Sequence, residues 1–127
     1  MTKVSKASAE KTDIGAGDIY EQVVDGYEIT ILDLREETDM APLLRGLPGD
    51  LCPCEHWGYV VRGRVTFTFA DHAEVFEAGD AFRVLPGHSP STVAGTEWVL
   101  FTPEDQMAPV NEVIERNLAA LQSASLG

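Results

Sequence analysis

The fold of this chain is decided by residues 65–80, which read VTFTFADHAEVFEAGD. Apolar and polar side chains alternate over residues 65–69, which is typical of a strand with one buried face. The polar pair Asp71-His72 predicts a turn, and residues 74–76 predict a second strand that returns beside the first. A glycine-containing turn at residues 77–80 ends this second strand. The stretch therefore predicts an antiparallel β-hairpin.

The same succession of short strands and turns extends outward from the hairpin on both sides. Further strands are predicted at residues 27–34, 57–62, 81–85, 91–94 and 98–102. In the first of them, apolar side chains occupy one face (Tyr27, Ile29 and Ile31) and polar side chains the other (Glu28 and Thr30). This is the pattern of a strand that buries its apolar face. Short strands with glycine-bearing turns predict an all-β fold, an antiparallel sandwich or barrel, over residues 13–104.

The two ends of the chain differ from this β-rich part. Residues 1–12 are small and polar without periodicity, and they predict a flexible tail. Residues 105–127 predict a C-terminal amphipathic helix and tail, because apolar side chains recur at helical spacing. These apolar positions are Val110, Val113, Ile114, Leu118 and Leu121.

Charge and composition exclude several classes of protein. The 127 residues carry 9 Lys and Arg against 21 Asp and Glu, a formal charge of −12, and 44% of them are hydrophobic, which argues against a disordered chain. All three lysines lie in the first eleven residues, so the remainder carries 6 Arg against 20 acids, and we expect no nucleic-acid or membrane partner. Two cysteines exclude a multi-disulfide scaffold. With no apolar run of membrane-spanning length and no signal-peptide pattern, we expect a cytoplasmic protein.

The residues that carry chemistry gather in residues 50–59, which read DLCPCEHWGY. Pro53 disfavours a helix here and pushes the preceding residue toward extended angles. In an extended segment Cys52, Cys54 and His56 project to the same face. Thiolates and imidazoles are zinc ligands, so this spacing predicts a metal site.

Several alternatives remain open for this stretch. A fourth ligand would come from His88, which lies on a predicted turn, or from Asp50, which shares the strand parity of the two cysteines. His72 lies at the tip of the predicted hairpin, where solvent exposure is the default. The cysteines could also be buried core residues, or a redox-active or nucleophilic thiol pair. We favour metal ligation, because it explains why two thiols and an imidazole share one face.

Two segments resemble the motifs of the cupin family, whose members form a small antiparallel β-barrel of the jelly-roll type. Residues 59–63 (YVVRG) are similar to the strand end that closes the first motif, and residues 79–87 (GDAFRVLPG) are similar to the second. Fifteen residues separate the two motifs, as in compact bacterial single-domain members. The resemblance covers residues 50–103. It implies a barrel that holds a small molecule, and pairing of two such barrels as a homodimer.

The sequence departs from the cupin pattern at every ligand position. Asp50 and Cys52 stand at the two histidines of the first motif, and His56 stands at its glutamate. Pro90 stands at the histidine of the second motif. The family's iron or manganese site and its dioxygenase activity are therefore not carried over. Two ligand sets remain: Asp50, Cys52 and His56 by strict register, or Cys52, Cys54, His56 and His88 by chemistry, which we favour because two thiolates select a metal such as zinc.

These observations together predict a zinc-type metal-binding cupin that holds a small molecule in its barrel. If His88 binds, four protein ligands close the site and indicate a structural or sensing role. If it does not, an open position on the metal would suit a lyase, isomerase or hydrolase. Gly58 shares the parity of His56 and is expected to leave room for a ligand. The alternatives are a non-enzymatic small-molecule or metal sensor, and a thiol-redox protein that uses Cys52 and Cys54.

Overall fold

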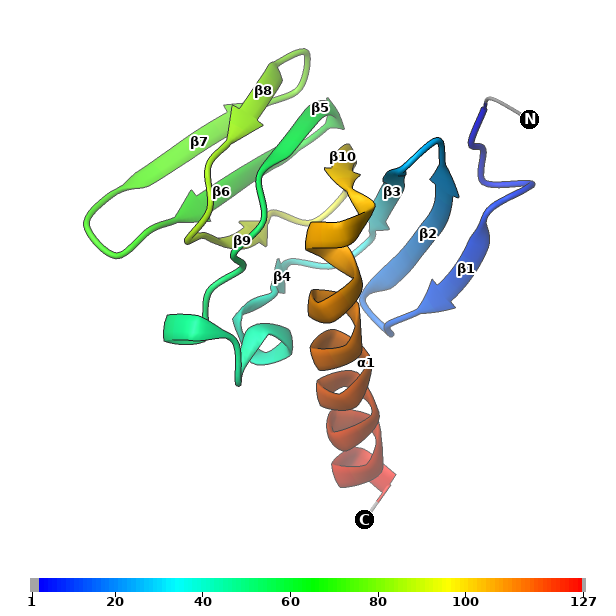
Figure 1. Cartoon of the computed structure of the whole chain (residues 1–127), viewed down its shortest axis with the longest axis vertical. Coiled ribbons are helices and arrows are strands. Elements are labelled where there is room, and N and C mark those ends of the chain that lie inside the picture. Colours follow the sequence, from blue (N-terminus) through cyan, green and yellow to red (C-terminus); the bar gives the residue numbers. More distant parts are fainter. Residues whose placement is uncertain (1–2, 127) are drawn as a thin grey trace.

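Two antiparallel β-sheets and a C-terminal helix make up the computed structural model, which describes residues 3–126 (Figure 1). The larger sheet has the order β1 (Glu10–Asp13), β2 (Gly17–Val24), β3 (Tyr27–Leu34), β10 (Thr96–Pro103), β5 (His56–Arg62) and β8 (Ala81–Val84). The smaller sheet has the order β4 (Thr38–Asp39), β9 (Ser89–Thr92), β6 (Arg64–Thr68) and β7 (Ala73–Glu77). The predicted all-β architecture with a C-terminal helix is confirmed. Within the described residues no strand pairing joins the two sheets, so they form a sandwich and not a closed ring.

One hydrophobic core holds the two sheets together. The predicted hairpin over residues 65–80 is confirmed as β6 and β7, which pair in antiparallel register. From β6, the Phe67 ring lies 5.6 Å from the Trp98 ring of β10 and 5.6 Å from the Phe82 ring of β8. Because aromatic side chains bury the most apolar area, these contacts across the sandwich contribute strongly to its stability.

Strand β3 carries polar side chains inward over its first half, which is opposite to the prediction. Glu28 and Thr30 are buried, whereas Tyr27 is 47% exposed and Ile29 is only partly buried. Further along the same inner face, Leu32 joins the hydrophobic core. The prediction that the apolar face is buried is therefore wrong for the first half of β3, because this part of the strand lines a cavity.

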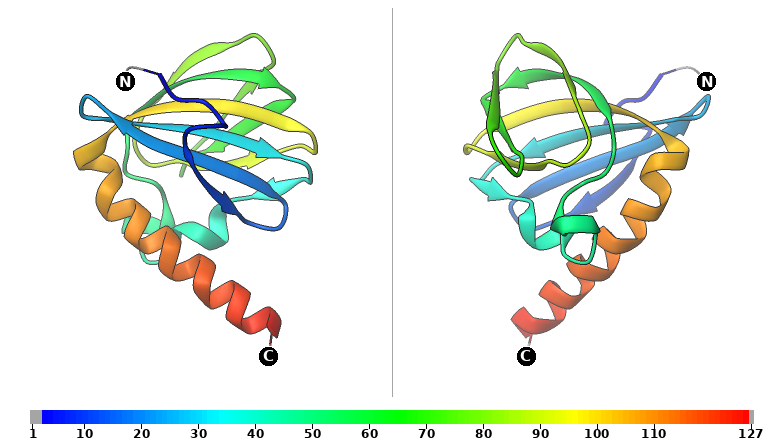
Figure 2. Two further views of the ribbon diagram at one scale, coloured as in Figure 1. Left: turned by 90° about the vertical axis from the view of Figure 1, so that its right-hand side faces the viewer. Right: turned by 60° about the vertical axis from the view of Figure 1, so that its left-hand side comes forward.

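Helix α1 (Glu104–Leu126) covers one end of the sandwich and the loop that precedes β5 (Figure 2). That loop contains two short 3-10 helices, η1 (Ala41–Leu44) and η2 (Pro48–Asp50). The Asn117 side chain donates hydrogen bonds to the carbonyls of Leu43 and Arg45, both at 2.8 Å. The helix thus fixes the chain that leads into residues 52–56. In residues 3–126 no helix combines the length and the apolar composition required to cross a membrane.

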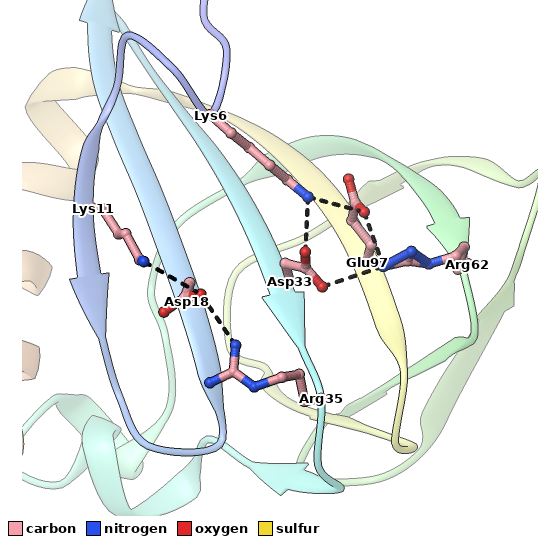
Figure 3. A network of polar contacts seen from close by, with 7 residues as sticks. All are labelled: Lys6, Lys11, Asp18, Asp33, Arg35, Arg62 and Glu97. Atoms are coloured by element: carbon pink, nitrogen blue, oxygen red, sulfur yellow. Dashed lines mark hydrogen bonds and ion pairs between the residues drawn. The ribbon is translucent and has the colours of Figure 1, made fainter.

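Charged side chains tie the segment before β1 to the outer face of the larger sheet (Figure 3). Lys6 Nζ lies 2.7 Å from Asp33 and 3.3 Å from Glu97, and Arg62 approaches the same two carboxylates at 3.2 and 3.0 Å. Because exposed ion pairs contribute little each, the pairing of β1 with β2 is the stronger constraint. Strand β1 begins at Glu10, inside the segment expected to be a tail, and residues 1 and 2 of that segment lie outside the described residues.

Candidate metal centre and its cavity

Three of the side chains singled out in the sequence converge in the interior. Cys52, His56 and His88 each offer one ligand atom, and these atoms all lie within 4.8 Å of one another. All three residues are buried, with at most 5% of their surface exposed. The rings of His56 and His88 have their centroids 4.9 Å apart. A buried group of this composition could hold a metal ion.

A backbone bridge brings Cys52 and His88 together across a long stretch of sequence. The amide of Cys52 donates to the carbonyl of His88 at 2.8 Å, and the amide of Gly87 donates to the carbonyl of Cys52 at 2.8 Å. Gly87 has φ of +94°, a conformation that glycine adopts without steric cost. The Pro86-Gly87 turn therefore serves to present His88 to the loop before β5.

Both histidines are oriented by a hydrogen bond at Nδ1. His56 is the first residue of β5, and its Nδ1 lies 2.7 Å from Thr102 Oγ1 on the neighbouring strand β10. His88 Nδ1 donates to the carbonyl of Leu85 at 2.7 Å. His56 Nε2 lies 3.6 Å from Cys52 Sγ. Metal-binding histidines characteristically use one ring nitrogen in this way and leave the other for the ion.

The surrounding groups favour the thiolate form of Cys52. The pKa of Cys52 lies well below its usual range. The neighbouring Cys54 thiol is the largest cause, hydrogen bonds with His56 and His88 lower the pKa further, and burial opposes these effects. The closeness of Cys52, together with burial, raises the pKa of Cys54, which remains a thiol. The thiolate is the form of cysteine that binds metals.

Cys54, the fourth residue of the favoured set, lies next to this group but faces helix α1. Its fully buried Sγ donates to the carbonyl of Gln106 at 3.2 Å and lies 4.0 Å from Met107 Sδ. Burial alternates over residues 52–56 as an extended segment requires. The strand β5 begins only at His56, so no neighbouring strand holds the preceding residues to one face.

The other histidine and the aspartate of the sequence analysis lie outside the group. Asp50 is exposed, has φ of +58°, and accepts a hydrogen bond from the amide of Gly46 at 3.0 Å. Positive φ at both Gly49 and Asp50 ends the extended parity that linked Asp50 to Cys52. His72 is exposed, as expected, and hydrogen-bonds with Asp71.

A cavity of about 100 Å³ opens beside Cys52, His56 and His88. Its wall is mostly apolar, and its other polar side chains are Glu21, Glu28, Thr30, Thr102 and Asn111. Gly58 does not contribute room to it, because a Cβ at Gly58 would overlap the Phe82 ring; that expectation is wrong. The sequence pattern gives no signal for Thr102 and Asn111 as cavity residues. It places Glu28 on the solvent side of its strand, because a polar strand face ordinarily faces water.

Comparison with known proteins gives the fold a class. No family model matches the chain, and no curated protein matches its sequence. An RmlC-like cupin from Shewanella frigidimarina NCIMB 400 is 18% identical, covers 79% of this chain and 88% of its own, and superimposes with a TM-score of 0.52. The predicted resemblance is confirmed at the level of the fold: this chain has the cupin fold.

Two further solved structures share this fold. PAC13 from Streptomyces, solved with uridine, is 16% identical, covers 82% of each chain and has a TM-score of 0.56. The polyketide cyclase RemF from Streptomyces resistomycificus is 15% identical, covers 82% of this chain and 80% of its own, and has a TM-score of 0.55. The same fold thus occurs in proteins with different small-molecule chemistry, so function must be argued from the site.

The hydrogen bond between Thr102 and His56 generates a first prediction. Thr102→Val keeps the shape of the side chain but removes the hydroxyl that orients His56, and we expect it to lower the affinity for added Zn²⁺ by about 10- to 100-fold. Competition with a chromogenic chelator measures this affinity. Thr92→Val is the matched control, because Thr92 is equally buried and its hydroxyl has no hydrogen-bond partner in the described part of the chain. Equal effects of the two substitutions would contradict the role assigned to Thr102.

Glu21 generates a prediction about stability against pH. The pKa of Glu21 is raised from 4.5 to about 7. Burial of the side chain is the largest cause, and the nearby carboxylates of Glu28, Glu10 and Glu115 raise the pKa further. Folding therefore favours the protonated form, and this contribution to stability is fully present below pH 4.5 and is lost as the pH rises to about 7. Glu21→Gln cannot ionise, so between pH 4 and pH 8 it should lose less stability than the unchanged protein.

Between these two pH values the unchanged protein should lose on the order of 2 kcal/mol more of its unfolding free energy than Glu21→Gln does. This figure is smaller than the pKa shift alone would give, because Glu21 is only partly buried. Thermal unfolding at the two pH values measures it. Glu37→Gln removes the same charge from an exposed position and should follow the unchanged protein. A pH dependence of Glu21→Gln identical to that of the control would refute the assigned pKa shift.

Proposed function

We propose that this protein is a metal-dependent cupin in which Cys52, His56 and His88 hold one divalent metal ion at the wall of a small-molecule cavity. The observation that carries this proposal is the convergence of three buried ligand atoms within 4.8 Å, at the edge of a mostly apolar cavity. Two of the residues are histidines whose Nδ1 atoms already have hydrogen-bond partners. Such outer contacts are typical of built metal sites and less so of histidines that merely fill a core.

We further propose that the ion is zinc. Zn–S distances of about 2.3 Å and Zn–N distances of about 2.0–2.1 Å place a sulfur and a nitrogen ligand about 3.6 Å apart around a tetrahedral ion. Cys52 Sγ and His56 Nε2 are 3.6 Å apart, so the observed geometry fits such an ion. A thiolate with two imidazoles is also a donor set that zinc accepts readily, and among the described residues no carboxylate joins the group.

Three protein ligands leave one coordination position for the cavity. When bound, zinc in such a site polarises a carbonyl group or makes a bound water more acidic, which suits a lyase, isomerase or hydrolase. The residues of this chain prepare the site for that chemistry. Thr102 and the carbonyl of Leu85 orient the two imidazoles, and apolar side chains such as Trp98 and Leu100 line the cavity beside them. Two reduced cysteines suit a reducing compartment, and we assign the protein to the cytoplasm.

We also propose that the outer face of the larger sheet pairs two copies as a homodimer. Large apolar side chains are exposed there on adjacent strands: Trp57 is 55% exposed, Tyr59 45% and Phe101 40%. Trp57 lies directly opposite Phe101 in the register of β5 and β10, so these side chains form one patch. Apolar patches of this kind on soluble proteins commonly mark interfaces.

Substitution of the ligands tests the metal proposal. We expect Cys52→Ser, His56→Ala and His88→Ala each to lower zinc affinity by at least about 100-fold, and Cys54→Ser by less than about tenfold. Zinc content after dialysis and chelator competition measure both. His72→Ala is the control, because His72 is an exposed histidine outside the group.

Two outcomes of this test are diagnostic. A loss in Cys54→Ser as large as that in Cys52→Ser would make Cys54 a ligand, close the site with four protein ligands and favour a sensor. Undiminished zinc binding in Cys52→Ser and His56→Ala would contradict the metal proposal, and would leave the redox pair of Cys52 and Cys54 as the favoured function.

Light scattering tests the homodimer. We expect twice the 13.8-kDa chain mass at micromolar concentration. Trp57→Lys puts a charge in the patch and should shift the protein to monomer, whereas Val75→Lys, at an equally exposed position (52%) on β7 of the other sheet, should leave the mass unchanged. A monomer mass for the unchanged protein at all concentrations would contradict this interface.

A further inference from the structure

The inner face of β3 holds a carboxylate that the proposed metal site does not use. Glu28 is only 6% exposed, although strand patterns ordinarily put a glutamate at this position into water. Its two carboxylate oxygens accept hydrogen bonds from Asn111 Nδ2 at 2.6 Å and from Thr30 Oγ1 at 3.4 Å, and Glu28 also hydrogen-bonds with the carboxyl group of Glu21. None of these three partners is positively charged, so hydrogen bonds are satisfied while the carboxylate has no counter-ion. A buried charge of this kind is costly unless a positive group pairs with it.

Glu28 and the candidate metal centre face the same cavity. Glu28 on β3 pairs with Thr102 on β10, and Thr102 in turn hydrogen-bonds His56 on β5. The three residues therefore lie in one row across adjacent strands, and the backbones of Glu28 and His56 are about 10 Å apart, two strand spacings. Glu28 also lines the cavity itself. A small molecule within it can contact the carboxylate at one end and the Cys52–His56–His88 group at the other.

The charged side chains around the Glu28 end of the cavity are acidic. A second cavity of about 250 Å³, between β1, β2 and α1, shares Glu21, Glu28 and Asn111 with the first. Its wall adds the carboxylates of Glu10 and Glu115. Among the described residues that line either cavity, none is a lysine or an arginine. Such a surface repels phosphates and carboxylates and attracts cations.

We infer that Glu28 is the specificity-determining residue of the cavity and that the ligand is a small organic amine whose ammonium group pairs with the Glu28 carboxylate. The apolar wall then covers the carbon chain of the amine. That its far end reaches a metal rests on the proposed function, whereas the preference for a cation rests on Glu28 and the acidic side chains around it and does not need the metal. The raised pKa of Glu21 agrees with an uncompensated negative field at this end of the cavity.

Three probes of similar size and different charge test this inference: n-butylammonium, n-butanol and butyrate. Each is titrated into the full chain followed by ¹⁵N-¹H NMR, once as purified and once with added Zn²⁺. We expect n-butylammonium to bind at least about tenfold more tightly than n-butanol, and butyrate not to bind, with the shifted amides near Glu28 and Asn111. Equal binding of the three probes or tighter binding of butyrate would overturn the inference. So would the absence of binding of any probe up to about 20 mM, which is on the order of the weakest affinity expected of a specific small ligand.

Glu28→Gln locates the effect. Its side-chain oxygen can still accept from Asn111, so the helix contact is kept while the charge is lost. We expect this variant to bind n-butylammonium about tenfold more weakly and n-butanol as before, whereas Glu37→Gln keeps the full preference. Retained preference in Glu28→Gln would assign the selectivity to another residue and overturn the proposal. If Glu28→Gln unfolds, the ranking of the three probes in the unchanged protein still tests whether the cavity prefers a cation. Failure of the metal proposal would appear separately, as a lack of bound zinc with the amine preference intact.

Discussion

The backbone bridge between Cys52 and His88 is the contact on which the candidate site depends. It joins the loop before β5 to the turn before β9, and it does so through two main-chain hydrogen bonds of 2.8 Å. Neither segment is a regular strand at this point, so no sheet register would otherwise bring them together. Helix α1 packs on the same loop, which explains how a short irregular segment can be held firmly enough to carry a ligand. Preorganisation of this kind lowers the cost of binding a metal ion or a ligand.

A second constraint is the placement of polar side chains on the inner face of the larger sheet. Glu28, Thr102 and His56 occupy one row across β3, β10 and β5, while Trp57 and Phe101 from the same strands are exposed on the outer face. A sandwich selected for stability alone would reverse this arrangement. The inner row gives the cavity two polar ends, and the outer patch is the apolar surface that we propose to pair two copies. Both departures have a functional interpretation, and strained or costly placements are expected at functional sites.

The fold could be predicted largely from the sequence because its signals are local. The alternation in residues 65–69 and the helical spacing of apolar side chains from Val110 to Leu121 each depend on neighbours in the chain. The candidate site was predictable only in part. Extended geometry predicts that Cys52, Cys54 and His56 share one face, and all three are buried, but the contact of Cys54 with the Gln106 carbonyl depends on where α1 packs. Glu28 could not be assigned to a cavity, because a polar strand face has the same pattern whether it meets water or a buried ligand site.

X-ray absorption spectroscopy of the protein purified without added metal tests the central claim most directly. We expect about one zinc ion per chain, with one sulfur ligand at about 2.3 Å and the remaining nitrogen or oxygen ligands at about 2.0–2.1 Å. A metal bound only through nitrogen and oxygen, or a chain that purifies without metal and takes up no zinc when it is offered, would contradict the account.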